Sequence, residues 1–364
     1  MNYTFKENTY TIERYPPTQS KSLKAWNAAD EHILNFLEET KTSKKNTVIF
    51  NDRFGFLSLF TAQYNPLVVL DYKSQEKALI LNFKTNNITF DLPTNNSISK
   101  SDKLYELALI KIPKSLDLFR LQLSQIHHSL AESGEVVCGF MTKYFSKQYL
   151  SIASEFFEEC TQSKAWKKSR VLVLKKKKEV KKKTYLNEIF YSKEKTFKQH
   201  FGVFSAKNID YASQFFMENM DVRMDHNKIL DLASGNGVIA YAVQKERPNA
   251  EIDLLDDSIL ALESSKMNIE GDNITFHYND CLDNFEDQTF DLIVSNPPFH
   301  FEHETNIEIA LELFKEVKRC LKKGGSFQMV TSNHLNSKTH LYKLFHKVDI
   351  VREDLKFVVY NCHS

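Results

Sequence analysis

The chain has 364 residues, a formal net charge of +1 and 42% hydrophobic residues. This length predicts two compact domains, each with its own core, and the composition is that of an ordinary globular protein. No apolar run approaches the ~20 residues that a bilayer span needs, and the start of the chain lacks a signal-peptide pattern, so we expect a cytoplasmic protein without a membrane segment. The five cysteines include no Cys-x-x-Cys pair, so we expect neither a disulfide framework nor a metal site.

Positive charge is concentrated near the middle of the chain. Residues 161–200 contain 14 Lys or Arg and three Glu, so the rest of the chain is net negative. Two lysine runs, Lys175–Lys178 and Lys181–Lys183, lie within this stretch. Such runs are typical of a solvated linker, and they are also typical of a surface that contacts nucleic-acid phosphates. The sequence leaves both interpretations open.

The two halves of the chain resemble each other. The tetrapeptide Asn-Ile-Thr-Phe occurs at residues 87–90 and again at residues 273–276, a separation of 186 residues. Further landmarks that keep the same order indicate an internal duplication. These further pairs are Asp71 with Asp257, Asn82 with Asn268, Thr47–Phe50 with Lys228–Leu230, and Tyr105–Ile110 with Phe290–Ser295.

Each half alternates short apolar runs with segments of helical length. This alternation predicts parallel strands joined by helices that cover both faces of a sheet. We therefore expect an α/β protein with two doubly wound, Rossmann-like domains in tandem. The expected boundaries are residues 1–174 for the first domain, 175–200 for a basic linker with short strands, and 201–364 for the second domain.

The second half carries the signals of an adenosine site. Strand residues 228–230 lead into Asp231–Gly237, a turn of small residues whose glycines let the backbone approach a ligand at the start of a helix. The next strand ends at Asp256, where a carboxylate can accept hydrogen bonds from ribose hydroxyls, and a further strand leads to Asp280, placed to meet an adenine amine. The turn lacks both the full Gly-x-Gly-x-x-Gly of a dinucleotide site and the Lys-Ser or Lys-Thr of a triphosphate site. We expect a ligand without phosphate.

The following strand, Asp291–Ser295, leads directly into Asn296-Pro297-Pro298-Phe299. Two prolines make this turn rigid and remove backbone donors, so the turn presents oxygen acceptors. The asparagine side-chain oxygen and a proline carbonyl suit the two protons of an exocyclic base amine, and Phe299 offers a face for stacking the base. These residues predict methyl transfer from a sulfonium donor to that amine. The alternative is an ordinary turn whose prolines end a strand.

These motifs resemble the ribosomal RNA (guanine-N2)-methyltransferases of the RlmG/RsmC type, a family with the class I methyltransferase fold. The likeness covers nearly the whole chain and is stronger to the large-subunit branch than to the small-subunit branch. It includes Gly202–Ser205 with Asp210, Leu321–Gly325 and Lys356–Val359 in the second half, and Arg14–Pro17, Ala25–Asp30, Asn51–Gly55 and Ala165–Lys168 in the first half.

The resemblance implies roles for individual residues. Asn296, Pro297 and Phe299 would be catalytic and would hold the target guanine. S-adenosylmethionine would be bound by Phe204, Asp231, Ala233, Gly235, Gly237, Asp256, Asp280 and Asn296. The family's usual Gly-Cys-Gly is Ala233-Ser234-Gly235 here. An alanine fits a turn that needs no positive φ, so we expect shifted cofactor contacts and not their loss.

The first half lacks the catalytic motif. Lys111-Ile112-Pro113-Lys114 stands where the second half has Asn296–Phe299, and bulky Arg53 and Phe54 occupy the turn. We therefore expect a degenerate domain that cannot hold the cofactor and that either binds RNA or only stabilises its partner domain. The residues expected to contact RNA phosphates are Lys111, Lys114, Lys167, Lys168, Lys175 and Lys176.

The resemblance implies transfer of a methyl group from S-adenosylmethionine to the exocyclic N2 of a guanine in 23S ribosomal RNA, with S-adenosylhomocysteine as product. The substrate would be naked RNA or an assembly intermediate, and the enzyme would be a monomer. Alternatives remain open. They are a methyltransferase that acts on adenine N6, on a guanine of 16S RNA or on a protein glutamine, and a non-catalytic RNA-binding factor of ribosome assembly.

Overall fold

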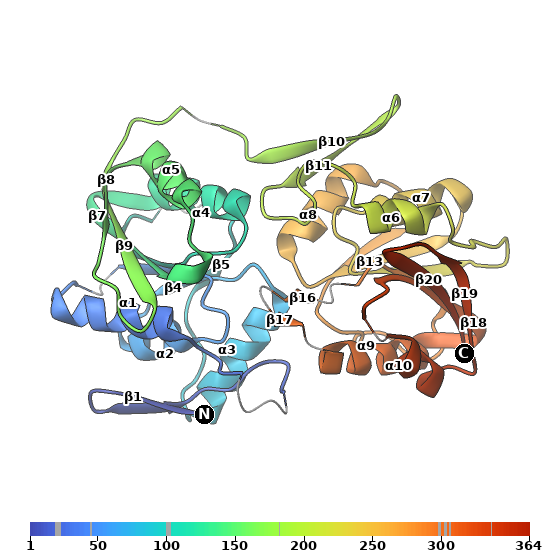
Figure 1. Cartoon of the computed structure of the whole chain (residues 1–364), viewed down its shortest axis with the longest axis horizontal. Helices are drawn as coiled ribbons and strands as arrows, with labels where there is room; N and C mark the ends of the chain where they lie inside the picture. Colours follow the sequence, from blue (N-terminus) through green and yellow to red (C-terminus); the bar gives the residue numbers. More distant parts are fainter. Residues whose placement is uncertain are drawn as a thin grey trace. The chain divides into compact units, whose positions relative to one another are not determined.

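The computed structural model describes residues 1–18, 23–43, 46–99, 103–181, 183–297, 300–301, 304–305, 307–335 and 337–364, with backbone alone for those between 300 and 310. The chain forms two compact units, Met1–Tyr185 and Leu186–Ser364 (Figure 1). Each unit is built around a seven-stranded sheet. The expected tandem α/β architecture is confirmed.

The elements of the first unit are β1 (Asn2–Phe5), β2 (Asn8–Thr11), α1 (Ala28–Glu39), β3 (Thr47–Phe50), α2 (Phe56–Thr61), β4 (Leu67–Val69), α3 (Lys73–Thr85), β5 (Thr94–Asn95), β6 (Tyr105–Lys111), α4 (Leu116–Ser129), β7 (Leu130–Met141), α5 (Lys147–Phe156), β8 (Phe157–Gln162) and β9 (Ser169–Lys177). Those of the second unit are β10 (Leu186–Ser192), β11 (Lys195–His200), α6 (Tyr211–Met217), β12 (Lys228–Leu232), α7 (Val238–Glu246), β13 (Glu251–Asp256), α8 (Ile259–Asn268), β14 (Ile274–Tyr278), β15 (Phe290–Ser295), β16 (His300–Phe301), β17 (Glu304–Thr305), α9 (Ile307–Cys320), β18 (Leu321–Ser332), α10 (Ser337–Leu344), β19 (Lys347–Glu353) and β20 (Phe357–His363).

The two sheets have the same topology. Their strand orders are β5-β4-β3-β6-β7-β9-β8 and β14-β13-β12-β15-β18-β20-β19. In each order the first five strands pair in parallel, and the remaining neighbours pair antiparallel. In each unit the chain passes from a central strand, β3 or β12, outward to one edge of the sheet. It then returns and continues on the other side of that central strand. Ligands of doubly wound sheets bind at this reversal, beside the carboxyl ends of the central strands.

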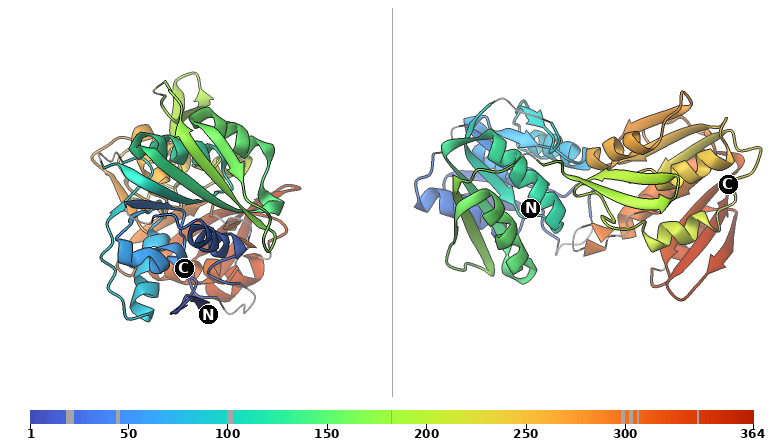
Figure 2. Two further views of the ribbon diagram at one scale, coloured as in Figure 1. Left: turned by 90° about the vertical axis from the view of Figure 1, so that its left-hand side faces the viewer. Right: turned by 90° about the horizontal axis from the view of Figure 1, so that it is seen from above.

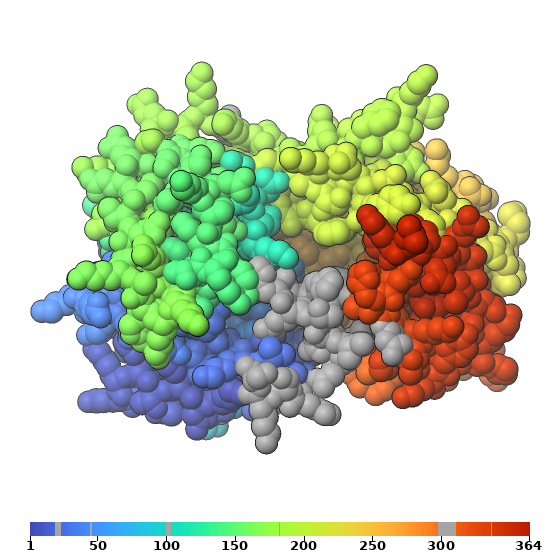
Figure 3. All heavy atoms as spheres, viewed as in Figure 1, coloured from blue at the N-terminus to red at the C-terminus, as the bar shows by residue number. Residues whose placement is uncertain are grey.

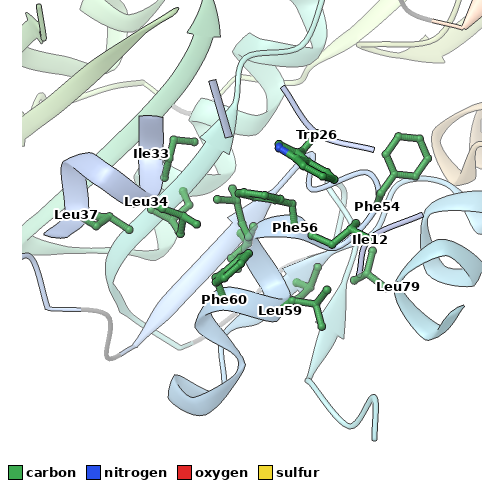
Figure 4. Packing of buried hydrophobic residues seen from close by; sticks show 14 of the residues in the cluster. Ile12, Trp26, Ile33, Leu34, Leu37, Phe54, Phe56, Leu59, Phe60 and Leu79 are labelled. Carbon is green, nitrogen blue, oxygen red and sulfur yellow. The ribbon is translucent and has the colours of Figure 1, made fainter. Parts of the chain in front are cut away.

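Helices cover both faces of each sheet (Figure 2). In the first unit α1, α2 and α3 pack on one face, and α4 and α5 pack on the other. In the second unit α6, α7 and α8 face α9 and α10 across the sheet in the same way. Successive strand residues enter opposite cores, as Ile49 and Phe50 do. Figure 4 shows the first of these cores, where Phe56 lies between the rings of Trp26 and Phe60.

Equivalent helices of the two units begin with equivalent caps. Asn27 precedes α1, where its side chain accepts a hydrogen bond from the backbone N–H of Ala29, and Asp30 accepts one from the backbone N–H of Asn27. Asp210 precedes α6 and accepts from the backbone N–H of Ser213. Such side chains satisfy N–H groups that the first helical turn leaves free. The caps also place polar side chains at one edge of each sheet.

The duplication extends to a β-hairpin at the start of each unit, which the sequence did not reveal. Strands β1 and β2 form the first hairpin, and β10 and β11 form the second. Asn82 of α3 accepts a hydrogen bond from the backbone N–H of Glu13 and donates to the same residue's carbonyl. Asn268 of α8 makes the same pair of bonds with Lys198. Asn82 and Asn268, which the sequence paired, thus occupy equivalent positions and make equivalent hydrogen bonds.

The repeated tetrapeptide itself is not structurally equivalent. Residues 273–276 lead into and form part of β14, whereas residues 87–90 precede β5. Asn95 of β5 and His277 of β14 pair with equivalent residues of the neighbouring strands, and they are 182 residues apart, not 186. The first unit is therefore four residues longer between its third helix and the next strand. The two units are duplicates in fold, but the two copies of the tetrapeptide that suggested this occupy different positions in them.

The boundary between the units differs from the one expected. Strand β9 continues to Lys177, where it pairs with Phe157 of β8, and the first unit extends to Tyr185. Residues 186–200 belong to the hairpin of the second unit, whose side chains (yellow-green) protrude in Figure 3. Residues 175–200 are therefore not a separate linker, because strand pairing draws their two ends into different sheets. None of the described helices is long and apolar enough to cross a membrane.

Candidate active site

The carboxyl ends of the central strands bring the predicted site residues of the second unit together. The last residue of β12 lies opposite Leu255 of β13 and opposite the last residue of β15. The residues that follow these positions, Ala233, Asp256 and Asn296, therefore line one edge of the sheet. The last residue of β14 lies opposite Asp256, which places Asp280 at the same edge.

The turn after β12 leaves open space beside Gly235. A Cβ atom added there would meet no heavy atom within 4 Å, and φ of this residue is 58°. Ala233 also has a left-handed φ, 60°, so the expectation that this position needs no positive φ is wrong. Alanine adopts this conformation at a steric cost that glycine would avoid. The open space fits a ligand that approaches the backbone closely.

Gly237 and Asp231 shape the start of α7. A Cβ atom at Gly237 would lie 2.8 Å from Ile269 Cδ1, and φ of this residue is 83°, so both packing and backbone conformation favour glycine here. Asp231 is fully buried, and its Oδ2 accepts from the backbone N–H of Ala240 at 2.9 Å. Its Oδ1 is buried without a hydrogen-bond partner among the described residues. Burial raises the pKa of Asp231, and the charge of Asp256 raises it further.

Asp256 is fixed by two backbone donors. Its Oδ2 accepts from the N–H of Gly235 and its Oδ1 from the N–H of Ser258, both at 2.8 Å. Burial raises the pKa of Asp256 to about 7, although these two donors lower it. Each carboxylate oxygen keeps a second lone pair that can accept from a ribose hydroxyl. Asp280 is partly exposed at the same edge, and its backbone N–H donates to Asn279 Oδ1.

Gln199 connects two parts of the site, and no sequence motif indicated it. This residue of β11 is fully buried, and its Nε2 donates to the carbonyls of Val203 and Phe204, each at 3.2 Å. Its Oε1 accepts from Asn236 Nδ2 at 2.8 Å. Gln199 therefore ties the loop that carries Phe204 to the turn after β12. The ring of Phe204 is 73% exposed. The sequence offered one signal for Gln199. It is a polar residue two positions after Phe197, so both side chains lie on the buried face of the strand.

Two residues at the start of α6 orient the side-chain amide of Asn296. Its Nδ2 donates to Ser213 Oγ at 2.9 Å and to Asp210 Oδ2 at 3.2 Å. Both amide protons are thereby used, and the part of the chain that the structure describes supplies no donor to Oδ1. That oxygen is available as an acceptor. Pro297 is buried, and Phe299 lies outside the described residues, so its stacking role stays a prediction.

The first unit fills the position of Asn296 with an internal ion pair. Lys111 occupies this position in the sheet register, and its ammonium lies 2.7 Å from Asp30 Oδ2. The Asp30 side chain is only 3% exposed. Asp30 stands three residues after the cap of α1, as Ser213 stands three residues after Asp210. Lys111 was expected to contact RNA, and in the structure its ammonium forms an ion pair with buried Asp30.

A polar network closes the same edge of the first unit. Buried Gln122 of α4 exchanges two hydrogen bonds of 2.8 Å with Asn51, which occupies the position of Ala233, and it also donates to Asp71. Asp71 accepts from both the backbone and the hydroxyl of Ser97. Phe54 lies within the core (Figure 4). Side chains therefore occupy the place where the second unit has open space beside its turn.

The other lysines expected to contact RNA are exposed. Ion pairs join Lys167 to Glu31 (3.0 Å), Lys175 to Glu135 (2.8 Å) and Lys176 to Glu159 (2.6 Å). Only the pair of Lys176 with Glu159 is exposed on both sides, and such pairs contribute little to stability, so exchanging this carboxylate for a phosphate costs little. The structure therefore leaves Lys176 able to meet a polyanion.

A cavity of about 910 Å³ lies elsewhere in the second unit. It is lined by β10 and by the C-terminal halves of α6 and α7, including Phe190, Met217 and Glu246. Helix α7 begins at the turn after β12 and runs away from it, so this cavity is separate from the edge that carries Asn296.

Comparisons with known proteins agree with this geometry. Residues 1–179 match the family model of the RLMG N-terminal domain, and residues 194–361 match that of the methyltransferase small domain. A ribosomal RNA large subunit methyltransferase G of Pseudoalteromonas translucida is 30% identical over 97% of this chain and 95% of its own length. One of Shewanella sp. (strain MR-4) is 31% identical over 95% of each.

A solved structure has the same fold over the whole chain. The 16S rRNA N2 methyltransferase RsmC of T. thermophilus, in complex with AdoMet and guanosine, superposes with a TM-score of 0.79 at 18% identity. The match covers 100% of this chain and 97% of that one. The expectation of two methyltransferase-like domains is confirmed.

Proposed function

The chain belongs to the ribosomal RNA large subunit methyltransferase G family, and from this premise we propose that it transfers a methyl group from S-adenosylmethionine to N2 of a guanine in 23S ribosomal RNA. The second unit carries the reaction, and the first is degenerate. The names of the relatives support the large-subunit substrate. The bound AdoMet and guanosine of the T. thermophilus neighbour support the donor and the target base.

The observation that carries the proposal is the orientation of the Asn296 amide. Because Asp210 and Ser213 accept both of its protons, its Oδ1 is left to accept one proton of the guanine amine. The carbonyl of Pro297 would accept the other. Two acceptors in this arrangement direct the nitrogen lone pair towards the methyl group. The nitrogen–methyl bond then forms as the sulfur–methyl bond breaks, and the amine loses its proton afterwards to water.

The turn after β12 and its neighbours would hold the donor. The space beside Gly235 would take the methionine part, Asp256 would accept from the ribose hydroxyls, and Asp280 would meet the adenine amine. Phe204 would cover the ligand from the loop that Gln199 supports. When bound, the sulfonium supplies an activated methyl group, so no strong general base is needed before transfer.

A direct assay tests the proposal. The purified full chain is incubated with methyl-labelled S-adenosylmethionine and deproteinised ribosomal RNA from cells that lack the protein. Nuclease digestion and mass spectrometry should find N2-methylguanosine in 23S RNA, and the Asn296→Ala variant should produce none. Label in N6-methyladenosine, in 16S RNA or only in protein would contradict the proposed substrate.

We also propose that exposed lysines of the first unit contact the RNA. The charge reversal Lys176→Glu should raise the KM for RNA and reduce the slope of log KM against log salt by about 1. Lys315→Glu is the matched control, because Lys315 is similarly exposed and forms a similar pair with Glu312 in the second unit. Equal effects of the two variants would indicate nonspecific electrostatics and no RNA surface on the first unit.

A further inference from the structure

The side-chain amide of Gln199 has a fixed orientation, because its two ends have different kinds of partner. Its Oε1 accepts from Nδ2 of Asn236, whose own Oδ1 accepts from the backbone N–H of Val238 at 3.3 Å. The carbonyl of Asn236 accepts from Asn268 Nδ2 at 2.9 Å, which holds this residue in place. The two protons of Gln199 Nε2 therefore point to the loop that carries Phe204. The turn after β12 thus sets the orientation of an amide that binds a separate loop.

The loop that carries Phe204 depends on this amide for its conformation. Ser205 has a left-handed φ of 58°, which costs free energy in a residue other than glycine and is kept only where other contacts hold it. The carbonyl of Ser205 lies 3.5 Å from Gln199 Nε2, so three successive carbonyls, 203–205, converge on one amide. The ring of Phe204 is largely exposed and gains little from packing. The backbone bonds to Gln199 therefore determine where this ring lies.

The first unit makes the same connection with different side chains. Arg14 occupies the position of Gln199, because each follows the residue whose backbone pairs with the equivalent asparagines of α3 and α8. Its guanidinium lies 5.0 Å from the ring centroid of Phe54, which occupies the position of Asn236, and its Nη1 donates to the carbonyl of Lys24 before α1. A cation over a ring tolerates several orientations, whereas a hydrogen bond between two amides does not. The directional connection thus occurs in the unit that has open space beside its turn.

We propose that Gln199 is a positioning residue for the cofactor: through its bond with Asn236 it holds the Phe204 loop where the ring covers the ligand, so that turn and loop bind S-adenosylmethionine together. The inference rests on the proposed function and adds a fully buried residue that acts through the loop. A loop that is ordered beforehand loses little conformational entropy on binding, so releasing it weakens affinity although every group that contacts the ligand is kept. Methyl transfer from bound cofactor depends on Asn296 and should not change.

Calorimetry with S-adenosylhomocysteine gives the first test. Gln199→Met keeps the length of the side chain but loses its hydrogen bonds, and it should raise the Kd about five- to tenfold, with kcat at saturating cofactor within about twofold of wild type. Gln328→Met is the matched control, because Gln328 is also fully buried and binds the backbone N–H and carbonyl of Asp221 at 2.8 and 2.7 Å. This control should lose comparable stability in urea and keep its Kd. An unchanged Kd in Gln199→Met, or an equal rise in both variants, would overturn the proposal.

A double-mutant cycle shows whether Gln199 acts through Phe204. Phe204→Ala alone should raise the Kd for S-adenosylhomocysteine about tenfold, because the loop then has no ring to place over the ligand. Adding Gln199→Met to this variant should raise the Kd by no more than about twofold further, since no ring is left to position. Fully additive effects would contradict the proposal, because Gln199 would then act on the turn alone.

Hydrogen–deuterium exchange of the ligand-free full chain separates this inference from the proposed function. In Gln199→Met, peptides that span residues 201–207 should exchange about tenfold faster than in wild type, while peptides of the first unit keep their rates. Asn236→Ala should accelerate the same loop peptides, although Asn236 contacts Gln199 and none of the loop carbonyls. Unchanged loop exchange in both variants would refute the positioning role. A wild-type chain that showed the expected exchange but bound no S-adenosylhomocysteine would refute the proposed function instead.

Discussion

The two units put the same backbone positions to different uses. Where the second unit has Asn296 held by Ser213, the first has Lys111 paired with Asp30. Where the second has open space beside its turn, the first has a network around Gln122. The positions that would face ligands in one unit have become internal contacts in the other. The same edge of one fold can therefore either leave room for a ligand or be closed by internal contacts.

The contacts that support the turn are retained in both units. Asn82 donates to the carbonyl of Phe54, and Asn268 donates to the carbonyl of the equivalent Asn236. A carboxylate also accepts from the third N–H of the following helix in each unit. It belongs to Asp52 in the first unit and to Asp231 in the second, so the contact survives although the residue that supplies the acceptor has moved along the chain. The contacts that support the turn are thus kept even in the unit that lacks the residues proposed to bind ligands.

The largest test of this comparison transfers one residue of the first unit to the second. In Asn296→Lys the ammonium should pair with Asp210, as Lys111 pairs with Asp30, and the acceptor oxygen is lost. We expect kcat to fall by about 100-fold or more while the Kd for S-adenosylhomocysteine stays within threefold, because the lost contact is to the substrate amine. Single-turnover kinetics and calorimetry measure the two quantities.

The outcome has a clear converse. If Asn296→Lys weakened S-adenosylhomocysteine binding as much as it slowed transfer, Asn296 would contact the cofactor more than the base. Lys111→Asn serves as a reciprocal control, and it should create no second cofactor site, because Gln122 and Asn51 still fill that edge.

The next test concerns the ion pair of the first unit. Lys111→Met leaves Asp30 buried without its cation, which should lower the free energy of unfolding by about 2 kcal/mol, less than a fully buried pair would lose, because the lysine side chain is 23% exposed. Lys176→Met removes a pair whose two side chains are 64% and 45% exposed, and it should leave the stability within the error of the measurement. Urea unfolding measures both. Equal losses would mean that the Lys111 pair contributes no more than a surface contact.

The sequence predicted those parts of the site that lie in one continuous segment. The turn after β12, the carboxylate at the end of β13 and the Asn-Pro-Pro-Phe segment each follow a strand, so alternation of elements was enough to bring them to one edge. The positive φ of Ala233 was missed because alanine carries no preference for it. Gln199 and Ser213 were missed because each reaches its partner across the fold, 37 and 83 residues away, with no local pattern.

The same limit explains why the ion pair of Lys111 with Asp30 was not predicted. A lysine that opens the degenerate Lys-Ile-Pro-Lys segment resembles an exposed surface residue in composition, and only the fold shows that Asp30, 81 residues earlier, reaches it. The repeated tetrapeptide Asn-Ile-Thr-Phe shows a second limit of the sequence comparison. A short identity can suggest a true duplication although its residues occupy different places, because insertions between helix and strand shift the chain without changing the sheet.

A third test uses pH. The pKa of Asp256 is raised from 3.8 to about 7, so this group binds its proton more tightly in the folded than in the unfolded protein. Its contribution to stability is therefore full below about pH 4 and is lost as pH rises through 7. Ligand binding should change in the opposite sense, since ribose hydroxyls need the charged carboxylate. Affinity for S-adenosylhomocysteine should fall about tenfold from pH 8 to pH 6.

The first unit suggests the control for this experiment. Leu70 occupies the position of Asp256 in the sheet register and cannot titrate. Calorimetry on Asp256→Asn should give weaker binding with a flat pH profile between 6 and 8. A slope that persisted in this variant would assign the titration to Asp231, whose pKa is also raised by burial.

The smallest effect is expected from Ser213, and it tests whether orientation alone matters. Ser213→Ala removes one of the two acceptors that hold the Asn296 amide and leaves Asp210 in place. The loss of one neutral hydrogen bond should lower kcat about two- to tenfold, with KM for RNA and Kd for S-adenosylhomocysteine unchanged. Ser213→Thr keeps the hydroxyl and should restore most of the rate. A fall in thermal stability with unchanged kcat would show that Ser213, like Asp30 in the first unit, serves only to hold the edge together.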